Sequence, residues 1–163
     1  MDTTALASSL LDPLPAHVTS GIRVVSAADG RGEVATTVPE RMTNVIGSLH
    51  SSGLIALADA AGLAAIIGAC RDEAGFRGVI PLGRAASLEF LAPGRGLLTA
   101  VCVLGEDAAN ALRLLYEGRT VKARLSTTAT ITDATGTAVC RGTFDWSLRR
   151  TPSDGASGGR ADG

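Results

Sequence analysis

One long apolar stretch constrains this sequence more than any other feature. From Leu49 to Ala69 almost every residue is apolar, Ala and Gly dominate, and a single carboxylate, Asp59, stands near the middle. A helix that is apolar all round is one that the rest of the protein encloses. An ionised carboxylate without a partner is costly in such surroundings, so we expect Asp59 to be neutralised, paired or used in chemistry.

The same stretch is long enough to resemble a membrane span. It consists largely of weakly apolar Ala and Gly, and the central Asp59 would add a cost of about 2.5–3.5 kcal/mol on insertion. We therefore expect a buried helix of a globular domain, with no membrane partner.

Charge and composition narrow the possible functions. The chain has 163 residues, which suits one domain with a sizeable core. Its net charge is −1, so nothing indicates a nucleic-acid partner or an anionic membrane surface.

The two histidines and three widely spaced cysteines are too few for a zinc site, and we expect no metal and no cofactor. Without a signal peptide, these cysteines favour the reducing cytoplasm. They are Cys70, Cys102 and Cys140, which we interpret as small packing residues.

The remaining elements follow from periodicity and turn residues. Residues 1–20 form an N-terminal segment that can open with a helix over Thr4–Leu11, which Pro13 and Pro15 end. A hairpin turn at Asp29-Gly30 joins the first two strands. The central helix comes next, with Ser48, Ser51 or Ser52 as its N-cap. Residues 151–163 are rich in Gly, Ser and charge, so we expect a disordered tail. The predicted strands are Ile22–Ala27, Gly32–Val38, Val79–Leu91, Leu97–Leu104, Thr120–Thr132 and Thr137–Leu148, with a helix over Glu106–Glu117.

This order predicts an α+β hotdog fold over residues 21–150. Strands that are joined by tight turns make an antiparallel sheet, and one long apolar helix needs a curved sheet wrapped round it to be covered. The helix over Glu106–Glu117 is then a short insertion before the last two strands. Trp146 and Phe144 share a strand face with Cys140 and Leu148, which we expect in the core or at a sheet interface.

One motif carries a resemblance to a known family. Asn44, Gly47, His50 and Asp59 resemble the N-x-x-G-x-x-H…D signature of hotdog-fold acyl-CoA thioesterases of the PaaI type. The likeness extends loosely over residues 21–149. It implies hydrolysis of a thioester to a free acid and coenzyme A, without a metal.

The resemblance also implies roles for individual residues. Asp59 would activate water or attack the thioester carbonyl, and Asn44 would hold the water or the thioester. The backbone N–H of Ser51, at the start of the helix, would polarise the carbonyl oxygen. We interpret His50 as shaping the turn into the helix. Gly47, His50, Ser52 and Gly83 complete the expected substrate-binding set.

The spacing along one helix predicts a shared site. Ser51 and Asp59 are eight residues apart, which is roughly 12 Å at 1.5 Å per residue. An attacking oxygen must come within about 3–3.5 Å of the carbonyl carbon. The two groups of one helix therefore cannot serve one carbonyl, and we expect a homodimer in which each site takes residues from both subunits. A homotetramer of two such dimers is compatible with the same argument.

Two departures from the family pattern keep other functions open. Ser51 and Ser52 replace the glycines that usually follow the histidine, and Gly83 stands where several relatives carry Ser or Thr near the carboxylate. A protein that binds acyl-CoA or lipid without turnover is therefore an alternative. A dehydratase acting on a hydroxyacyl thioester, with His50 and Asp59 as its acid–base pair, is a second alternative. The acyl group itself is not specified by the sequence. Arginines that could meet the phosphates of coenzyme A are Arg41, Arg71, Arg77, Arg84 and Arg95.

Overall fold

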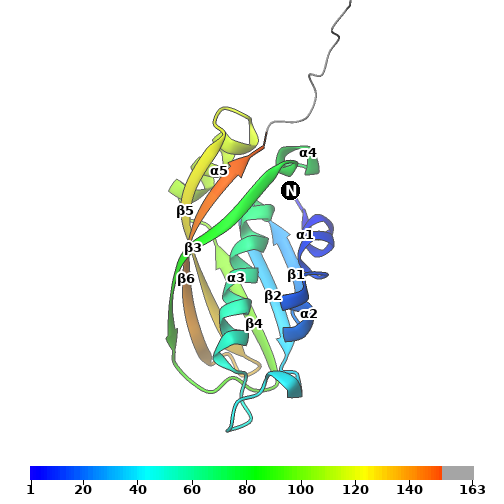
Figure 1. Cartoon of the computed structure of the whole chain (residues 1–163), viewed down its shortest axis with the longest axis vertical. Helices are drawn as coiled ribbons and strands as arrows, with labels where there is room; N and C mark the ends of the chain where they lie inside the picture. The colour runs from blue at the N-terminus through cyan, green and yellow to red at the C-terminus, as the bar shows by residue number, and fades with distance from the viewer. Residues whose placement is uncertain (152–163) are drawn as a thin grey trace, which may run out of the picture.

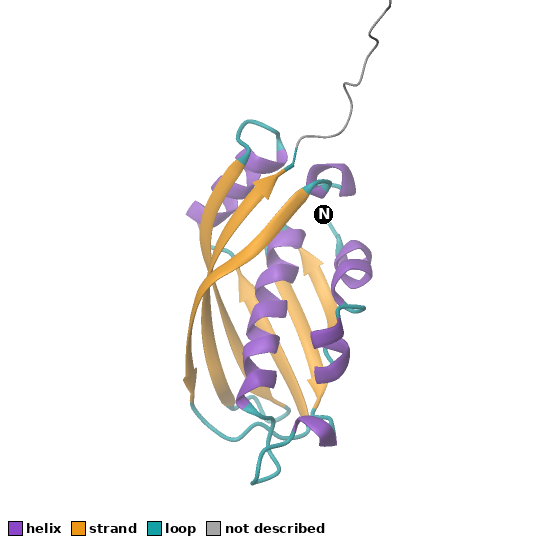
Figure 2. Cartoon of the chain, viewed as in Figure 1, coloured by secondary structure: helices purple, strands orange, loops and turns teal. Residues whose placement is uncertain are grey.

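The fold comes from a computed structural model that describes residues 1–151, so all but the first residue of the predicted tail lies outside the described residues. An antiparallel sheet curves round one long helix, α3, as the hotdog prediction requires (Figures 1 and 2). The strand order in the sheet is β1-β2-β4-β5-β6-β3. The elements are α1 (Thr4–Leu11), α2 (Pro15–Ser20), β1 (Arg23–Ala28), β2 (Arg31–Thr37), the 3-10 turn η1 (Glu40–Met42), α3 (Ser51–Gly68), α4 (Glu73–Phe76), β3 (Val79–Phe90), β4 (Leu97–Val103), α5 (Glu106–Tyr116), β5 (Lys122–Asp133) and β6 (Ala138–Arg150).

The apolar stretch that dominates the sequence forms α3, and the sheet covers it as expected. Of the described residues, this helix alone is long and apolar enough by composition to cross a membrane, and 67% of it is buried inside the fold. The buried residues of β5 and β6 alternate with exposed ones, which turns one face of the sheet toward α3. Trp146, Phe144, Cys140 and Leu148 all lie in this core.

Glycines of the sheet let α3 lie almost in contact with the strands. A Cβ atom on Gly32 of β2 would stand 2.3 Å from the backbone nitrogen of Ala65, and one on Gly142 of β6 would stand 2.7 Å from the Cβ of Ala58. No real side chain tolerates the first of these distances. The distance between α3 and β2 is therefore set by contact between their main chains at Gly32 and Ala65.

The start of the chain differs from the sequence prediction. Pro13 follows the end of α1, but Pro15 opens a second helix, α2, at its first position. Proline suits that position because the N–H it lacks has no partner inside the helix. The two helices lie beside α3, and α1 also packs against β1, the first strand of the sheet (Figure 1). The polar connection after α3 also contains a one-turn helix, α4, capped by Asp72.

Candidate active site

The loop before α3 is held together by the side chain of Asn44. Its Oδ1 accepts hydrogen bonds from the backbone N–H groups of Ile46 and Ser48, both at 3.1 Å, and its Nδ2 donates to Ser48 Oγ at 2.8 Å. Gly47 turns the loop with a φ of 75°, a conformation that suits glycine. The structure therefore gives Asn44 and Gly47 a part in shaping the entry to the helix.

His50, and none of the three predicted serines, is the N-cap of α3. Its Nδ1 accepts a hydrogen bond from the backbone N–H of Ser52 at 3.1 Å and another from Ser52 Oγ at 2.8 Å. A ring nitrogen that accepts from an N–H carries no hydrogen of its own. The serine prediction failed because a histidine nitrogen can accept the same N–H that a hydroxyl oxygen accepts at other N-caps.

Ser51, the first residue of α3, keeps a free backbone N–H. The next three N–H groups are bonded: Ser52 to the His50 ring, and Gly53 and Leu54 to the carbonyl of His50. Within the described residues no acceptor takes the N–H of Ser51. A free N–H at a helix N-terminus attracts negative charge, because the helix dipole adds to the local partial charge.

Ser51 lines a cavity of about 360 Å³. Asn44, Ser48 and Ser51 supply polar atoms, and the segment after β3 supplies the opposite wall. The apolar part of the wall is formed by Ile46, Leu49, Leu54, Phe90, Leu91, Ala92 and Pro93.

Asp59 lies half-way along α3 and lines a different cavity, of about 330 Å³. The walls of this cavity are almost wholly apolar and come from α1, α3, α4, β3 and β6. The Asp59 side chain is 32% exposed. Burial raises the pKa of its carboxyl above the ordinary value, and His17 opposes part of that rise. The lining side chains are Leu10, Leu11, Leu14, Asp59, Leu63, Ile67, Phe76, Pro81, Leu82 and Trp146, together with Gly83.

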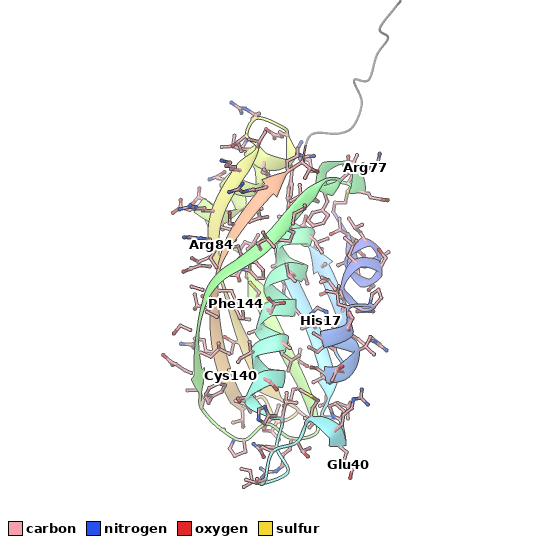
Figure 3. All side chains as sticks on the ribbon, in the orientation of Figure 1. His17, Glu40, Arg77, Arg84, Cys140 and Phe144 are labelled. Carbon is pink, nitrogen blue, oxygen red and sulfur yellow. The ribbon has the colours of Figure 1, made fainter. Side chains whose placement is uncertain are left out.

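Gly83 and His17 lie close to the Asp59 carboxylate, one in its cavity and the other facing its oxygen. Gly83 lines the same cavity, and a Cβ atom there would meet only Trp146, at 4.0 Å. The pairing of β3 with β6 shifts between Gly83 and Ala85, so a bulge lies beside the carboxylate. His17 of α2 points its Nε2 at Asp59 Oδ2 across 4.0 Å. Figure 3 shows His17 between α2 and α3.

Within one chain the predicted residues form two separate groups. Asn44, Ser51 and Ser52 lie at the N-terminal end of α3, whereas Asp59 and Gly83 lie at its middle. The two cavities share no lining residue. Eight helical residues separate Ser51 from Asp59, roughly 12 Å along the axis. One chain therefore presents two groups of candidate residues that line different cavities. We call them the N-terminal half-site (Asn44, Ser51 and Ser52) and the central half-site (Asp59 and Gly83).

Comparison with known proteins identifies the family. The family described as "Domain of unknown function (DUF4442)" matches residues 4–148. This chain belongs to that family. No curated protein sequence matches it.

Solved structures relate this DUF4442 chain to PaaI-like hotdog thioesterases, as the motif predicted. PA5026 from Pseudomonas aeruginosa, a protein of unknown function called a probable thioesterase, is 26% identical, with a TM-score of 0.72 over 91% of this chain and 96% of that one. The PaaI protein of the phenylacetic acid degradation operon of E. coli is 20% identical, with a TM-score of 0.62 over 89% and 90%. A hypothetical thioesterase from Streptococcus pneumoniae, in a structure with coenzyme A, is 20% identical, with a TM-score of 0.57 over 80% and 88%.

The largest cavity in this DUF4442 chain lies away from both half-sites. It measures about 420 Å³ and is lined by the end of α3, the β1–β2 turn and α5, including Cys70 and Tyr116. Burial raises the pKa of the Cys70 thiol to about 12, so this sulfur is a poor nucleophile. The cavity brings together none of the residues of the family motif. Among residues 1–151, no three His, Cys, Asp or Glu side chains cluster as metal ligands do.

His17 is the functional candidate that sequence reasoning did not single out. It lies between two prolines and a strand, outside the family motif and 42 positions before Asp59. No spacing rule connects the two residues, because α2 reaches α3 only through the tertiary fold. The one available sign was that His17 is the single histidine of residues 1–20.

Proposed function

We propose that this protein is an acyl-CoA thioesterase that hydrolyses its substrate to a free acid and coenzyme A. One observation carries the proposal: a single helix presents a free N–H at its first residue and a carboxylate in an apolar cavity at its middle. Thioester hydrolysis needs both groups, since charge develops on the carbonyl oxygen while a base activates the attacking water. The thioesterase relatives, one of them with coenzyme A, support the same reaction class.

In this proposal each motif residue has a defined part. The N–H of Ser51 donates to the thioester oxygen, which becomes an oxyanion as the carbon is attacked. Asp59 is the general base or nucleophile, and its apolar surroundings favour proton uptake during the step. Asn44 Nδ2 has a second hydrogen beyond the one given to Ser48, and that hydrogen is available to substrate or water. Gly47, His50 and Ser52 hold this end of the slot in shape.

The two half-sites meet in the proposal only across a homodimer. Strand β3 is an edge of the sheet, because it pairs with β6 on one side and with no described strand on the other. It is 12 residues long and exposes apolar side chains, including Ile80 at 46% and Leu82 at 59%. Long apolar edges of this kind pair with another chain. Pairing through β3 would bring the partner against the Asp59 cavity, to which β3 contributes Pro81, Leu82 and Gly83.

The cavity walls and the arginines support a substrate class, and the cysteines support a compartment. The apolar walls beside Asp59 suit the acyl group, and the exposed arginines of the chain suit the phosphates of coenzyme A. Arg41 and Arg95 already donate to backbone carbonyls, which leaves Arg71, Arg77 and Arg84 as the better candidates. The three cysteines are buried free thiols, which supports a reducing cytoplasm.

The test of the activity is release of free thiol from a panel of aliphatic and aromatic acyl-CoA substrates. We expect saturable hydrolysis of at least one substrate by the purified protein, with no added metal. Tight calorimetric binding of acyl-CoA without thiol release would favour the alternative, a binding protein, for which Gly83 beside Asp59 is the supporting observation. Loss of a double bond from an enoyl thioester, again without thiol release, would favour a dehydratase.

The test of the shared site uses two inactive chains. Asp59→Asn removes the carboxylate, and Ser51→Pro removes the N–H while leaving a helix-compatible residue. If the site is shared, a heterodimer of the two variants, co-expressed with different tags, contains one intact site and one doubly altered site. We expect it to recover about half of the parent rate. A heterodimer as inactive as either homodimer would contradict sites built across the interface.

A further inference from the structure

The ring of His17 is held in one orientation over Asp59. His17 is only 3% exposed, and its Nδ1 lies 2.7 Å from the backbone carbonyl oxygen of Leu11. A carbonyl oxygen can only accept a hydrogen bond, so Nδ1 carries the hydrogen. In the neutral ring Nε2 is then an acceptor.

Two acceptors therefore face each other when Asp59 is ionised. Nε2 of His17 and Oδ2 of Asp59 are 4.0 Å apart, beyond the range of a direct hydrogen bond. Nε2 has no hydrogen-bond partner among residues 1–151, yet in that part of the chain no fully enclosed side-chain nitrogen or oxygen lacks one. It follows that Nε2 is reached by solvent.

The separation of the two atoms suits one bridging water molecule. A water that donates bonds of about 2.8 Å to both places the acceptors roughly 4.0–4.6 Å apart, for an angle at its oxygen of about 90–110°. The observed separation of 4.0 Å lies at the lower end of that range. Such a water uses both hydrogens for the protein and turns its lone pairs outward.

Nothing else that ionises acts on this carboxylate. The elements packed around Asp59 contribute leucines from α1, Leu63 and Ile67 from α3 itself, Phe76 from α4, Pro81 and Leu82 from β3, and Trp146 from β6. Among the described residues, His17 of α2 is the one group whose charge affects the Asp59 carboxyl. No other ionisable group among the described residues therefore competes with His17 for the Asp59 carboxyl.

We propose that His17 Nε2 and Asp59 Oδ2 together hold the water that attacks the thioester, which makes His17 a further catalytic residue beside those of the family motif. The proposal rests on the thioesterase function above. The water oxygen forms a bond to the carbonyl carbon, and one water proton passes to the Asp59 carboxylate. The carbon–sulfur bond then breaks with its electron pair on sulfur, and the proton passes to that thiolate to give free coenzyme A. His17 Nε2 accepts a hydrogen bond from the water's second hydrogen throughout and so fixes the direction of attack.

This arrangement gives the N-terminal segment a function. Helix α2 supplies a side chain to the chemistry, and α1 supplies the Leu11 carbonyl that selects the tautomer. The water is held only while Nε2 of His17 remains an acceptor, which the bond from Nδ1 to Leu11 favours in the neutral ring.

Two substitutions separate a catalytic role from a structural one. His17→Asn keeps a donor near Nδ1 for the Leu11 carbonyl and removes the acceptor near Nε2. His17→Gln places an amide oxygen near Nε2. We expect kcat to fall about 10²-fold or more in His17→Asn with KM within about threefold of the parent, and His17→Gln to recover part of the loss. Val18→Ala, an exposed neighbour on the same helix, is the control and should match the parent.

The outcome that overturns the proposal is equally definite. If His17→Asn folds, as judged by an unchanged melting temperature, and hydrolyses acyl-CoA at the parent rate with the parent pH profile, His17 is structural. If the parent itself releases no thiol from any acyl-CoA, the proposed function fails instead.

The nitrogen-15 NMR spectrum of the imidazole tests the tautomer without any substrate. We expect the Nδ1–H tautomer of His17 at the pH of full activity. A doubly protonated ring or an Nε2–H tautomer at that pH would overturn the pairing. His50 supplies an internal comparison, because its Nδ1 is an acceptor and its neutral tautomer must be the opposite one.

Discussion

The two histidines of the chain occupy the two half-sites and are held in opposite tautomers. His50, at the N-terminal end of α3, uses Nδ1 to accept the N–H of Ser52. His17, above the middle of α3, uses Nδ1 to donate to Leu11 and leaves Nε2 as an acceptor toward Asp59. The first ring accepts from a backbone donor in the first turn of α3, and the second leaves an acceptor free beside a carboxylate.

In the proposed function, the difference gives one helix two kinds of chemistry. The N-terminal half-site would stabilise negative charge with a backbone N–H, which no change of pH removes. The central half-site would work through a carboxyl that ionises in an apolar cavity. The predictions below change one half-site at a time, beginning with the largest expected effect.

Asp59→Asn should abolish most of the activity. The amide is nearly the same size as the carboxyl but cannot take a proton from water, so kcat/KM should fall by about 10²–10⁴-fold. Thiol-release kinetics measure the loss, and calorimetric titration with acyl-CoA checks that the slot still binds. Retention of the parent rate would assign the base to another residue.

Ser51→Pro should cost less, because it removes one hydrogen bond to the oxyanion. The loss of kcat should be about 10²–10³-fold. His50 has a ψ of 147°, the extended conformation preferred before proline, so the helix should still begin at the same residue. Ser51→Ala keeps the N–H and is the matched control, with activity close to that of the parent. Equal losses in both variants would place the role in the hydroxyl and contradict the backbone assignment.

The same Asp59→Asn change should stabilise the fold, by an amount that grows with pH. The pKa of the buried carboxyl is raised above its ordinary value of 3.8, so the folded protein binds more protons than the unfolded chain in the interval between them. Well below pH 3.8, the carboxyl is neutral in both states and the variant should match the parent. As pH rises through the raised pKa, the parent loses stability relative to the variant. Urea unfolding at pH 4 and pH 8 measures the change, and a stability difference independent of pH would contradict it.

Gly83→Ser should have the smallest effect, and in the favourable direction. A side chain fits at this position, and a hydroxyl there would face the Asp59 cavity. We expect kcat to rise a few-fold, because the hydroxyl can hydrogen-bond the carboxylate or the water. Gly83→Ala adds the carbon without the oxygen and should leave kcat unchanged. A fall in kcat in both variants would mean that substrate needs the space above Gly83.

The order of the six strands and of α1, α3 and α5 was predictable because each rests on a local rule. The turn at Asp29-Gly30 has two positive φ values, as expected of its sequence, and α1 spans Thr4–Leu11 as its periodicity predicted. Strand ends were predicted to within two residues because Gly and Pro mark them. The central helix began later than its apolar stretch, at Ser51, because Leu49 belongs to the loop and bridges back to Thr43.

The parts that sequence did not predict depend on tertiary placement. A proline that opens a helix is indistinguishable in sequence from one that ends the helix before it, so α2 was missed. With α2 missed, nothing brought His17 to Asp59. The separation of Ser51 from Asp59 was predictable because helix geometry fixes it, whereas the contents of the two cavities required the fold.

The contact between Gly32 and the backbone of Ala65 has a consequence for how this protein can change over time. Because α3 rests on main chain at Gly32, exchanges among core side chains elsewhere leave this contact unchanged. In the proposed function, acyl selectivity would then change through α1, whose Leu10 and Leu11 line the Asp59 cavity.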